Sequence, residues 1–184
     1  MYNSHPGPHD YPRLFFTSAD LPAIRAKLDH PDCVAAWTRL LQACEQMLKP
    51  DPPPLYPRHI RPSHMAFAGL VTGRMEFFEK AMALTRDILE KDVWSSEGDR
   101  RLTWKAGLMT GHCIAETALA YDWLYHQWSG DERATIRAAI RDKGFAPYLD
   151  DMHNHARCTE WYTCNGMCVV NGPVLMAAIL LGPD

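Results

Sequence analysis

The sequence lacks the features that mark membrane-spanning and nucleic-acid-binding proteins. Its longest apolar stretch, residues 167–181, is shorter than the about 20 residues that cross a bilayer, and Asn171-Gly172-Pro173 interrupts it. We therefore interpret this stretch as a core helix and expect no membrane partner. No run of Lys and Arg forms a basic stripe, and the net charge is only −3, so we expect no nucleic-acid partner either.

Disulfide-scaffold spacing and a secretory leader are missing as well. The 6 cysteines lack the density and regular spacing of a disulfide-rich domain, so reduced thiols are expected. Residues 1–12 are polar and rich in Pro and His, with no apolar segment of the kind that a signal peptide needs. The protein is thus expected to be cytoplasmic as it stands, or periplasmic or secreted if a leader has been removed.

Alternating strand patterns are nearly absent, whereas helical periodicity recurs along the chain. With 184 residues, 47% of them hydrophobic and 22% charged, the composition is that of one globular domain. Apolar positions at helical spacing predict helices around residues 21–28, 34–48, 64–72, 77–89, 111–127, 130–141 and from Gly166 onward. We therefore expect residues 1–184 to form a single all-α domain.

Residues that end or cap helices separate these predicted helices. The prolines of Lys49–Pro62 exclude a helix interior there and predict a long connection. Ser63 is a candidate N-cap for the next helix and Gly73 its stop, while Ser129-Gly130-Asp131-Glu132 has the pattern of a capping box.

Buried and half-exposed helices alternate in this pattern. The segments 64–72, 111–127 and the one after Gly166 are apolar on most faces, and the segments between them are amphipathic. This alternation predicts helical hairpins packed side by side, either as a solenoid or closed into a double ring. The last apolar helix has no amphipathic partner after it, so we expect further domains or a partner subunit to cover it.

Four segments resemble one protein family. They are residues 11–21 with the continuation Ile24–Lys27, residues 118–125 (Ala-Leu-Ala-Tyr-Asp-Trp-Leu-Tyr), residues 132–137, and residues 165–172 (Asn-Gly-Met-Cys-Val-Val-Asn-Gly). In this order they are similar to segments of heparinase II/III-like and oligoalginate-lyase-like polysaccharide lyases.

The resemblance implies an incomplete (α/α) toroid of antiparallel helical hairpins, normally followed by a β-sandwich domain that is absent from this chain. It also implies β-elimination of acidic polysaccharides or oligosaccharides, such as alginate or glycosaminoglycan, without a cofactor in the chemical step. In that reaction a base removes the C5 proton of a uronate, a donor group offsets the carboxylate charge, and an acid assists the leaving oxygen.

The sequence departs from the family pattern in two places. Gly166 and Met167 stand where relatives often have Trp and then Asn. The catalytic Tyr of the family, and commonly a further His, come from segments beyond those that this chain contains. We therefore expect these 184 residues to lack a complete catalytic set.

Polar and aromatic residues just before the last apolar helix are the first candidates for a site. Asn165 matches the Asn at the helix start in the family and could bind the substrate carboxylate, although it also suits a helix cap. His155 and Tyr162 are candidates for proton transfer. Candidates for substrate binding are Trp161, as a sugar-stacking ring, and His153, Asn171, Arg61 and His64. Each of them also has an ordinary structural or surface interpretation.

Other residues of the sequence have a structural interpretation. The His153–Cys168 segment spells a series of His and Cys residues, but their spacing is not that of a standard zinc site, so we expect no metal. Asp122 lies in a helix that should be buried, and we expect it to accept structural hydrogen bonds rather than to act in catalysis. His112 begins the same helix and is either a satisfied core residue or part of a cleft.

Two alternatives to a lyase stay open. A uronyl C5-epimerase abstracts the same proton, so the residues alone do not separate the two reactions. A non-catalytic helical-repeat module that binds glycan or protein through its concave face is the second alternative, favoured if the chain is complete.

Overall fold

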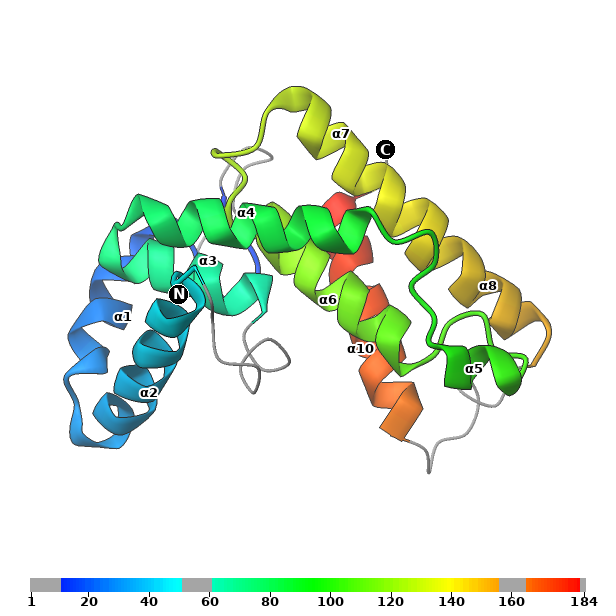
Figure 1. Ribbon diagram of the computed structural model, residues 1–184, viewed down its shortest axis with the longest axis horizontal. Coiled ribbons are helices and arrows are strands. Elements are labelled where there is room, and N and C mark those ends of the chain that lie inside the picture. Colours follow the sequence, from blue (N-terminus) through cyan, green and yellow to red (C-terminus); the bar gives the residue numbers. More distant parts are fainter. Residues whose placement is uncertain (1–10, 51–60, 156–164, 183–184) are drawn as a thin grey trace, which may run out of the picture.

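Every regular element in the computed structural model is a helix, and the structure describes residues 11–50, 61–155 and 165–182 (Figure 1). The elements are η1 (Ser18–Asp20), α1 (Leu21–Leu28), α2 (Pro31–Met47), α3 (Pro62–Thr72), α4 (Met75–Leu89), α5 (Glu97–Arg101), α6 (Leu108–Trp123), α7 (Gly130–Ala139), the π-helical η2 (Ile140–Phe145), α8 (Ala146–His153) and α10 (Asn165–Leu181). The prediction of an all-α fold is confirmed for these ranges.

Helix α6 is the centre of the packing. It contacts α3, α4, α7, η2 and α10, and residues along most of its length are buried. The contact with α10 is close because Gly111 has no side chain: a Cβ there would lie 2.1 Å from the carbonyl oxygen of Val169. Alanine at this position would therefore push α10 away from α6.

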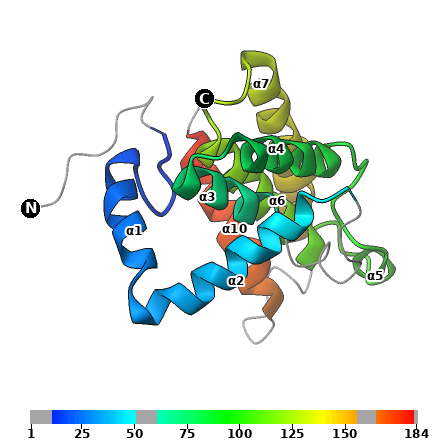
Figure 2. The same ribbon diagram turned by 60° about the vertical axis from the view of Figure 1, so that its left-hand side comes forward.

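The other helices are arranged around this centre. Helix α3 packs against α4, to which it is joined by a short turn, and against α6, which in turn packs against α10. Helices α7, η2 and α8 follow one another as a long, almost continuous rod that contacts α6 through η2 and α7 (Figure 1). Helices α1 and α2 form a bent pair at one edge of the molecule (Figure 2), and α2 buries only Cys44 and Met47 near its end.

Several predicted helix ends are confirmed and others are wrong. Gly73 ends α3 with φ 74°, and Ser129 caps α7 by accepting the Glu132 backbone N–H at 3.2 Å. Helix α3, however, begins at Pro62 rather than His64, so Ser63 lies inside its first turn. Helix α6 covers Leu108–Trp123 instead of the predicted 111–127.

None of the helices in the described ranges combines the length and the hydrophobicity needed to cross a membrane.

The buried carboxylate of Asp122 fixes the N-terminal segment to α6. It accepts the backbone N–H groups of Arg13 at 2.9 Å and Leu14 at 2.8 Å. The adjacent Trp123 donates its indole N–H to the carbonyl oxygen of Leu14 at 3.2 Å. These contacts join two of the segments that resemble the polysaccharide lyases, and they confirm that Asp122 is a structural acceptor.

Replacement of Asp122 by alanine should destabilise the protein. The Arg13 and Leu14 backbone donors would lose their acceptor next to a buried helix, so we expect the free energy of unfolding to fall by about 2 to 4 kcal/mol. Urea denaturation measures this change. Asp142→Ala, at an exposed carboxylate, is the control and should shift it by less than about 0.5 kcal/mol; equal effects of the two variants would contradict the assignment.

Asp122 should also give the stability a pH dependence. Burial raises its pKa from 3.8 to about 6, against the opposing effect of the Leu14 and Arg13 backbone donors and the Arg13 charge. The folded state therefore binds this proton more tightly than the unfolded state. The contribution of Asp122 is fully present below pH 3.8 and is lost as the pH rises through about 6.

The difference in unfolding free energy between the wild type and Asp122→Asn isolates this contribution, because asparagine does not titrate. As the pH rises from 3.8 through about 6, we expect the wild type to lose unfolding free energy relative to Asp122→Asn. A difference that is independent of pH would show that Asp122 has the same pKa in both states.

Candidate functional site

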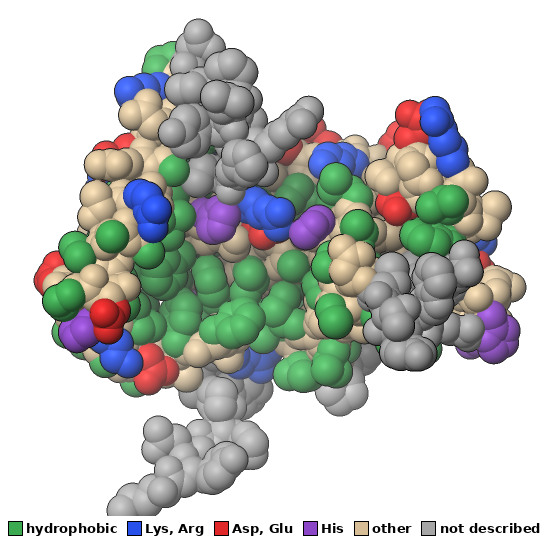
Figure 3. Space-filling view, turned by 90° about the horizontal axis from the view of Figure 1, so that it is seen from below, with side chains coloured by type: hydrophobic (Ala, Val, Ile, Leu, Met, Phe, Trp, Pro, Cys, Tyr) green, Lys and Arg blue, Asp and Glu red, His purple; other side chains and the backbone are tan. Residues whose placement is uncertain are grey.

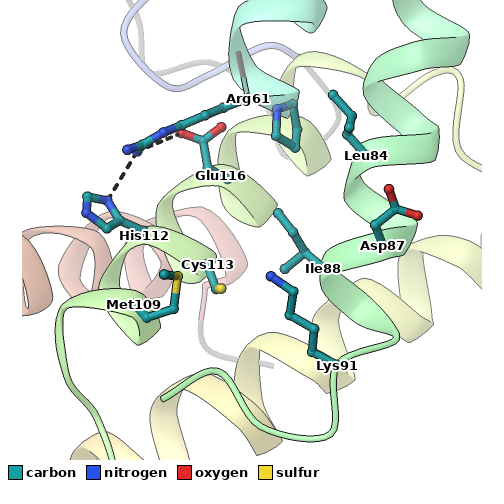
Figure 4. Close-up of a pocket in the computed structure, with 10 residues that line it drawn as sticks. Arg61, Leu84, Asp87, Ile88, Lys91, Met109, His112, Cys113 and Glu116 are labelled. Carbon is teal, nitrogen blue, oxygen red and sulfur yellow. Dashed lines mark hydrogen bonds and ion pairs between the residues drawn. The ribbon is translucent and has the colours of Figure 1, made fainter. Parts of the chain in front are cut away.

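A hollow of about 760 Å³ opens between the start of α3, the end of α4 and the first half of α6. On one face of the molecule, histidine and basic side chains form a row next to a hollowed hydrophobic area (Figure 3). The residues that line the hollow are Arg61, Pro62, Leu84, Asp87, Ile88, Lys91, Met109, His112, Cys113 and Glu116 (Figure 4). Their side chains combine both signs of charge with an apolar wall.

Arg61 and Glu116 are brought together by the way α3 begins. Arg61 is the residue before the helix, and Pro62 takes the first helical position, where the missing N–H costs nothing. The buried Glu116 accepts the Ser63 backbone N–H at 3.0 Å through Oε2. Its Oε1 lies 3.6 Å from Nη1 of Arg61, so one carboxylate both caps α3 and holds the guanidinium.

His112 completes the cluster on α6, one turn before Glu116. Its Nδ1 lies 3.1 Å from Nη1 of Arg61 (Figure 4). Because a guanidinium only donates, Nδ1 must accept, which assigns the proton of the neutral ring to Nε2. Burial, and then the positive charge of Arg61, lower the pKa of His112, while Glu116 opposes them. The cluster thus offers a guanidinium and a neutral imidazole donor.

The opposite wall of the hollow comes from α4 and from Lys91, two residues after the helix ends. Asp87 and Lys91 are one helical turn apart and both are exposed, with the half-buried Ile88 between them (Figure 4). Cys113 lies at the base, where burial raises the pKa of its thiol to about 11. Its thiol is therefore protonated near neutral pH and is a poor nucleophile.

Of the predicted substrate-binding residues, Arg61 lines this hollow, and His64 contacts Arg61 without lining it. Arg61 lines the hollow, and its backbone N–H donates to Nδ1 of His64 at 3.2 Å. His64 is half-buried on α3, and its carbonyl oxygen accepts a contact from the Cys44 thiol at 3.7 Å. Both residues stay predictions as ligand-binding groups.

The other predicted residues lie away from this hollow. His153 and His155 are exposed at the end of α8, and His155 lines a separate hollow of about 400 Å³ together with Trp104, Lys105 and Asp150. Asn165 is exposed at the first residue of α10.

Asn171 is half-buried on the same helix as Asn165, and among the described residues its Oδ1 has no hydrogen-bond partner although that atom is buried. Trp161 and Tyr162 lie outside the described residues. No group of three or more His, Cys, Asp or Glu side chains in the described ranges is arranged to hold a metal ion.

The sequence did not indicate Asp87, Lys91 or, above all, Glu116 as functional candidates. The only local signal for Glu116 is a carboxylate within an apolar helix, and that signal also applies to Asp122, which has a different role. The partner of Glu116 is the start of α3, which lies 53 positions earlier in the chain. No spacing rule connects two groups so far apart.

No protein-family model matches the chain, and no curated protein matches it either.

Removal of the Arg61 side chain should raise the pKa of His112. The positive charge of Arg61 is the second cause of the lowered value, and burial, the first cause, remains in the variant. NMR titration of isotope-labelled histidine in Arg61→Ala and wild type measures the change. Arg141→Ala, at an exposed arginine on η2, is the control and should leave the pKa of His112 as it is. A pKa that stays constant in Arg61→Ala would show that the contact is absent in solution.

Proposed function

We propose that this chain is part of a polysaccharide lyase-like protein and that the hollow at Arg61 binds glycans containing uronic acid, such as alginate or glycosaminoglycan. The observation that carries the proposal is the Arg61 guanidinium at the edge of a hollow of about 760 Å³, fixed by a buried carboxylate. A planar guanidinium pairs with a carboxylate through two parallel hydrogen bonds, which a lysine cannot do.

The contacts of Arg61 leave some of the N–H donors of its guanidinium for a ligand. Both its side-chain contacts among the described residues, with His112 and with Glu116, use Nη1. Nε and Nη2 have no hydrogen bond in the same residues. The side chain is 39% exposed and Glu116 only 9%, so the anchor is buried while the donor faces outward.

The mixed charges of the hollow suit a sugar acid better than a simple anion. Arg61 and Lys91 attract the carboxylate of a uronate, while the exposed carboxylate of Asp87 can accept hydroxyl groups. A simple anion offers no donors for Asp87 and would be repelled by it. A uronate carries both kinds of group on one ring.

The packing of the helices supports an incomplete (α/α) toroid. The apolar helices α3, α6 and α10 contact one another in chain order, and α4 and the rod of α7, η2 and α8 provide the alternating helices. The resemblance adds to this support, since Asp122 links two of its segments through the Arg13 and Leu14 backbone. In a toroid the row α3, α6 and α10 would face the cleft.

In the proposed reaction, a base accepts the C5 proton of the uronate, and the electron pair of the broken C5–H bond forms a double bond between C4 and C5. The bond between C4 and the glycosidic oxygen breaks, and that oxygen receives a proton. Arg61 would offset the carboxylate charge that otherwise opposes removal of the proton. Asn165, His155 and Tyr162 stay predictions for the other catalytic groups: Asn165 and His155 lie away from the Arg61 hollow, and Tyr162 lies outside the described residues. The chemistry needs no cofactor.

A second candidate is a non-catalytic module that binds such glycans. It is favoured by the state of Glu116, which already accepts the Ser63 N–H and pairs with Arg61, and is therefore committed to structure rather than to proton transfer. On this hypothesis the hollow binds the uronate without changing it.

Calorimetric titration with uronic acid oligosaccharides tests the binding that both candidates share. We expect Arg61→Ala to weaken binding about tenfold or more, and Arg61→Lys to recover only part of the loss, because the charge returns without the fork. Arg141→Ala should bind like the wild type, and a neutral oligosaccharide should bind far more weakly. Equal affinities of Arg61→Ala and the wild type would overturn the proposal.

Product analysis separates the candidate activities. An unsaturated uronate that absorbs ultraviolet light indicates a lyase. Solvent deuterium at C5 without that absorbance indicates an epimerase, and binding with neither product indicates the module. The assay is run on this chain and, if the gene encodes one, on a longer form of the protein.

A further inference from the structure

Helices α3 and α6 each leave one stripe of side chains partly uncovered on the side of the Arg61 site. On α3, His64 and Phe67 are half-buried, whereas the residues on both sides of each are buried. On α6, the half-buried His112, Leu119 and Trp123 recur at the spacing of one helical face, which Glu116 shares. Each stripe runs from a polar end, near Arg61, to an aromatic end.

Four aromatic side chains from four segments gather at the aromatic end. They are Phe16 of the N-terminal segment, Trp37 of α2, Phe67 of α3 and Trp123 of α6, which we call the aromatic floor. The ring centres of Phe67 and Trp123 are 6.0 Å apart, those of Phe16 and Trp123 5.2 Å, and those of Trp37 and Phe67 6.1 Å. All four side chains are half-buried.

The rings of the aromatic floor are held in fixed and different orientations. Trp37 stands at 86° to Phe67, and Phe16 at 68° to Phe67. The indole N–H of Trp123 donates to the Leu14 carbonyl oxygen, which fixes this ring against the N-terminal segment. Figure 3 shows a hollowed hydrophobic area beside the row of histidine and basic side chains, consistent with the two stripes.

We propose that the aromatic floor is a second binding site, which packs against the apolar faces of sugar rings that follow the ring held at Arg61. This inference rests on the proposed function of the Arg61 site. A sugar ring has C–H groups on its faces and hydroxyl groups at its rim, so an aromatic surface beside polar groups matches both parts. A purely aliphatic ligand would pack against the aromatic floor but would have no groups to pair with the charged residues of the Arg61 site.

The length of the surface defines the ligand further. The helical rise places His112 and Trp123 about 16 Å apart along α6. One sugar ring is shorter than this distance, so a ligand that reaches both ends is an oligosaccharide. The ligand class is therefore an oligosaccharide with an anionic ring at Arg61 and further rings over the aromatic floor.

Variants at Trp37 and Phe67 test the aromatic floor without disturbing the Trp123 hydrogen bond. We expect Trp37→Ala and Phe67→Ala each to weaken binding of a uronic acid oligosaccharide about tenfold and to leave the weaker binding of a single uronate unchanged. Trp37→Phe, which keeps a ring, should retain most of the affinity. Val34→Ala, at an exposed position one turn earlier on α2, is the matched control and should bind like the wild type.

Calorimetry with the monosaccharide and with the oligosaccharide measures both affinities, and circular dichroism with thermal melting checks that each variant is folded. If Arg61→Ala weakens oligosaccharide binding while Trp37→Ala and Phe67→Ala do not, the proposal that the aromatic floor binds sugar rings is overturned and the proposed function stands. If no variant changes the affinity, both are overturned. If Trp37→Ala only dissociates a dimer in sedimentation experiments, the surface joins two copies of this chain, and the proposal is overturned as well.

Discussion

The ion pair between Glu116 and Arg61 is the constraint on which the candidate site depends. A carboxylate on the central helix is costly to bury unless donors surround it, and here the donors are the first turn of α3 and a guanidinium. The same contact therefore sets the position of α3 against α6 and the direction of Arg61. Beside the Arg61 guanidinium, which only donates, the neutral His112 ring must be the tautomer that carries its proton on Nε2.

Helix α6 carries a second buried carboxylate, Asp122, which has a different structural role. Asp122 accepts backbone N–H groups from the N-terminal segment, and Glu116 accepts one from α3. Two segments far apart in the sequence are thus attached to one helix by the same interaction, in which a buried carboxylate accepts backbone N–H groups. The Asp122 end stabilises the fold, whereas the Glu116 end opens on a hollow. This difference follows from what lies beside each carboxylate rather than from the residue type.

The sequence predicts much of the fold because apolar spacing is a local property. Leu21, Ile24 and Leu28, for example, mark α1, and the Ser129 capping box marks the start of α7. Helix α3 begins two residues before the predicted start, and the donor–acceptor pair of Ser63 and Glu116 in its first turn is long-range. The π-helical turn of η2 also escaped prediction, since there Gly144 must approach Ile114 and Trp94 in three dimensions.

The site was predictable only in part, for the same reason. Arg61 and His64 stand in the sequence where the chain enters a buried helix, and they lie together in the structure. The sequence does not decide between a core and a cleft role for His112 and does not indicate Glu116, because the neighbours that define these residues come from another segment of the chain.

The most direct test of the account is a double-mutant cycle of oligosaccharide affinity with Glu116→Gln and Arg61→Ala. Glutamine keeps an acceptor for the Ser63 N–H but removes the charge that holds Arg61. If Glu116 acts on the ligand through Arg61, Glu116→Gln should weaken binding in the wild-type background and have little further effect once Arg61 is alanine. Additive losses of binding free energy would contradict this account, because they would show that the two residues act on the ligand independently.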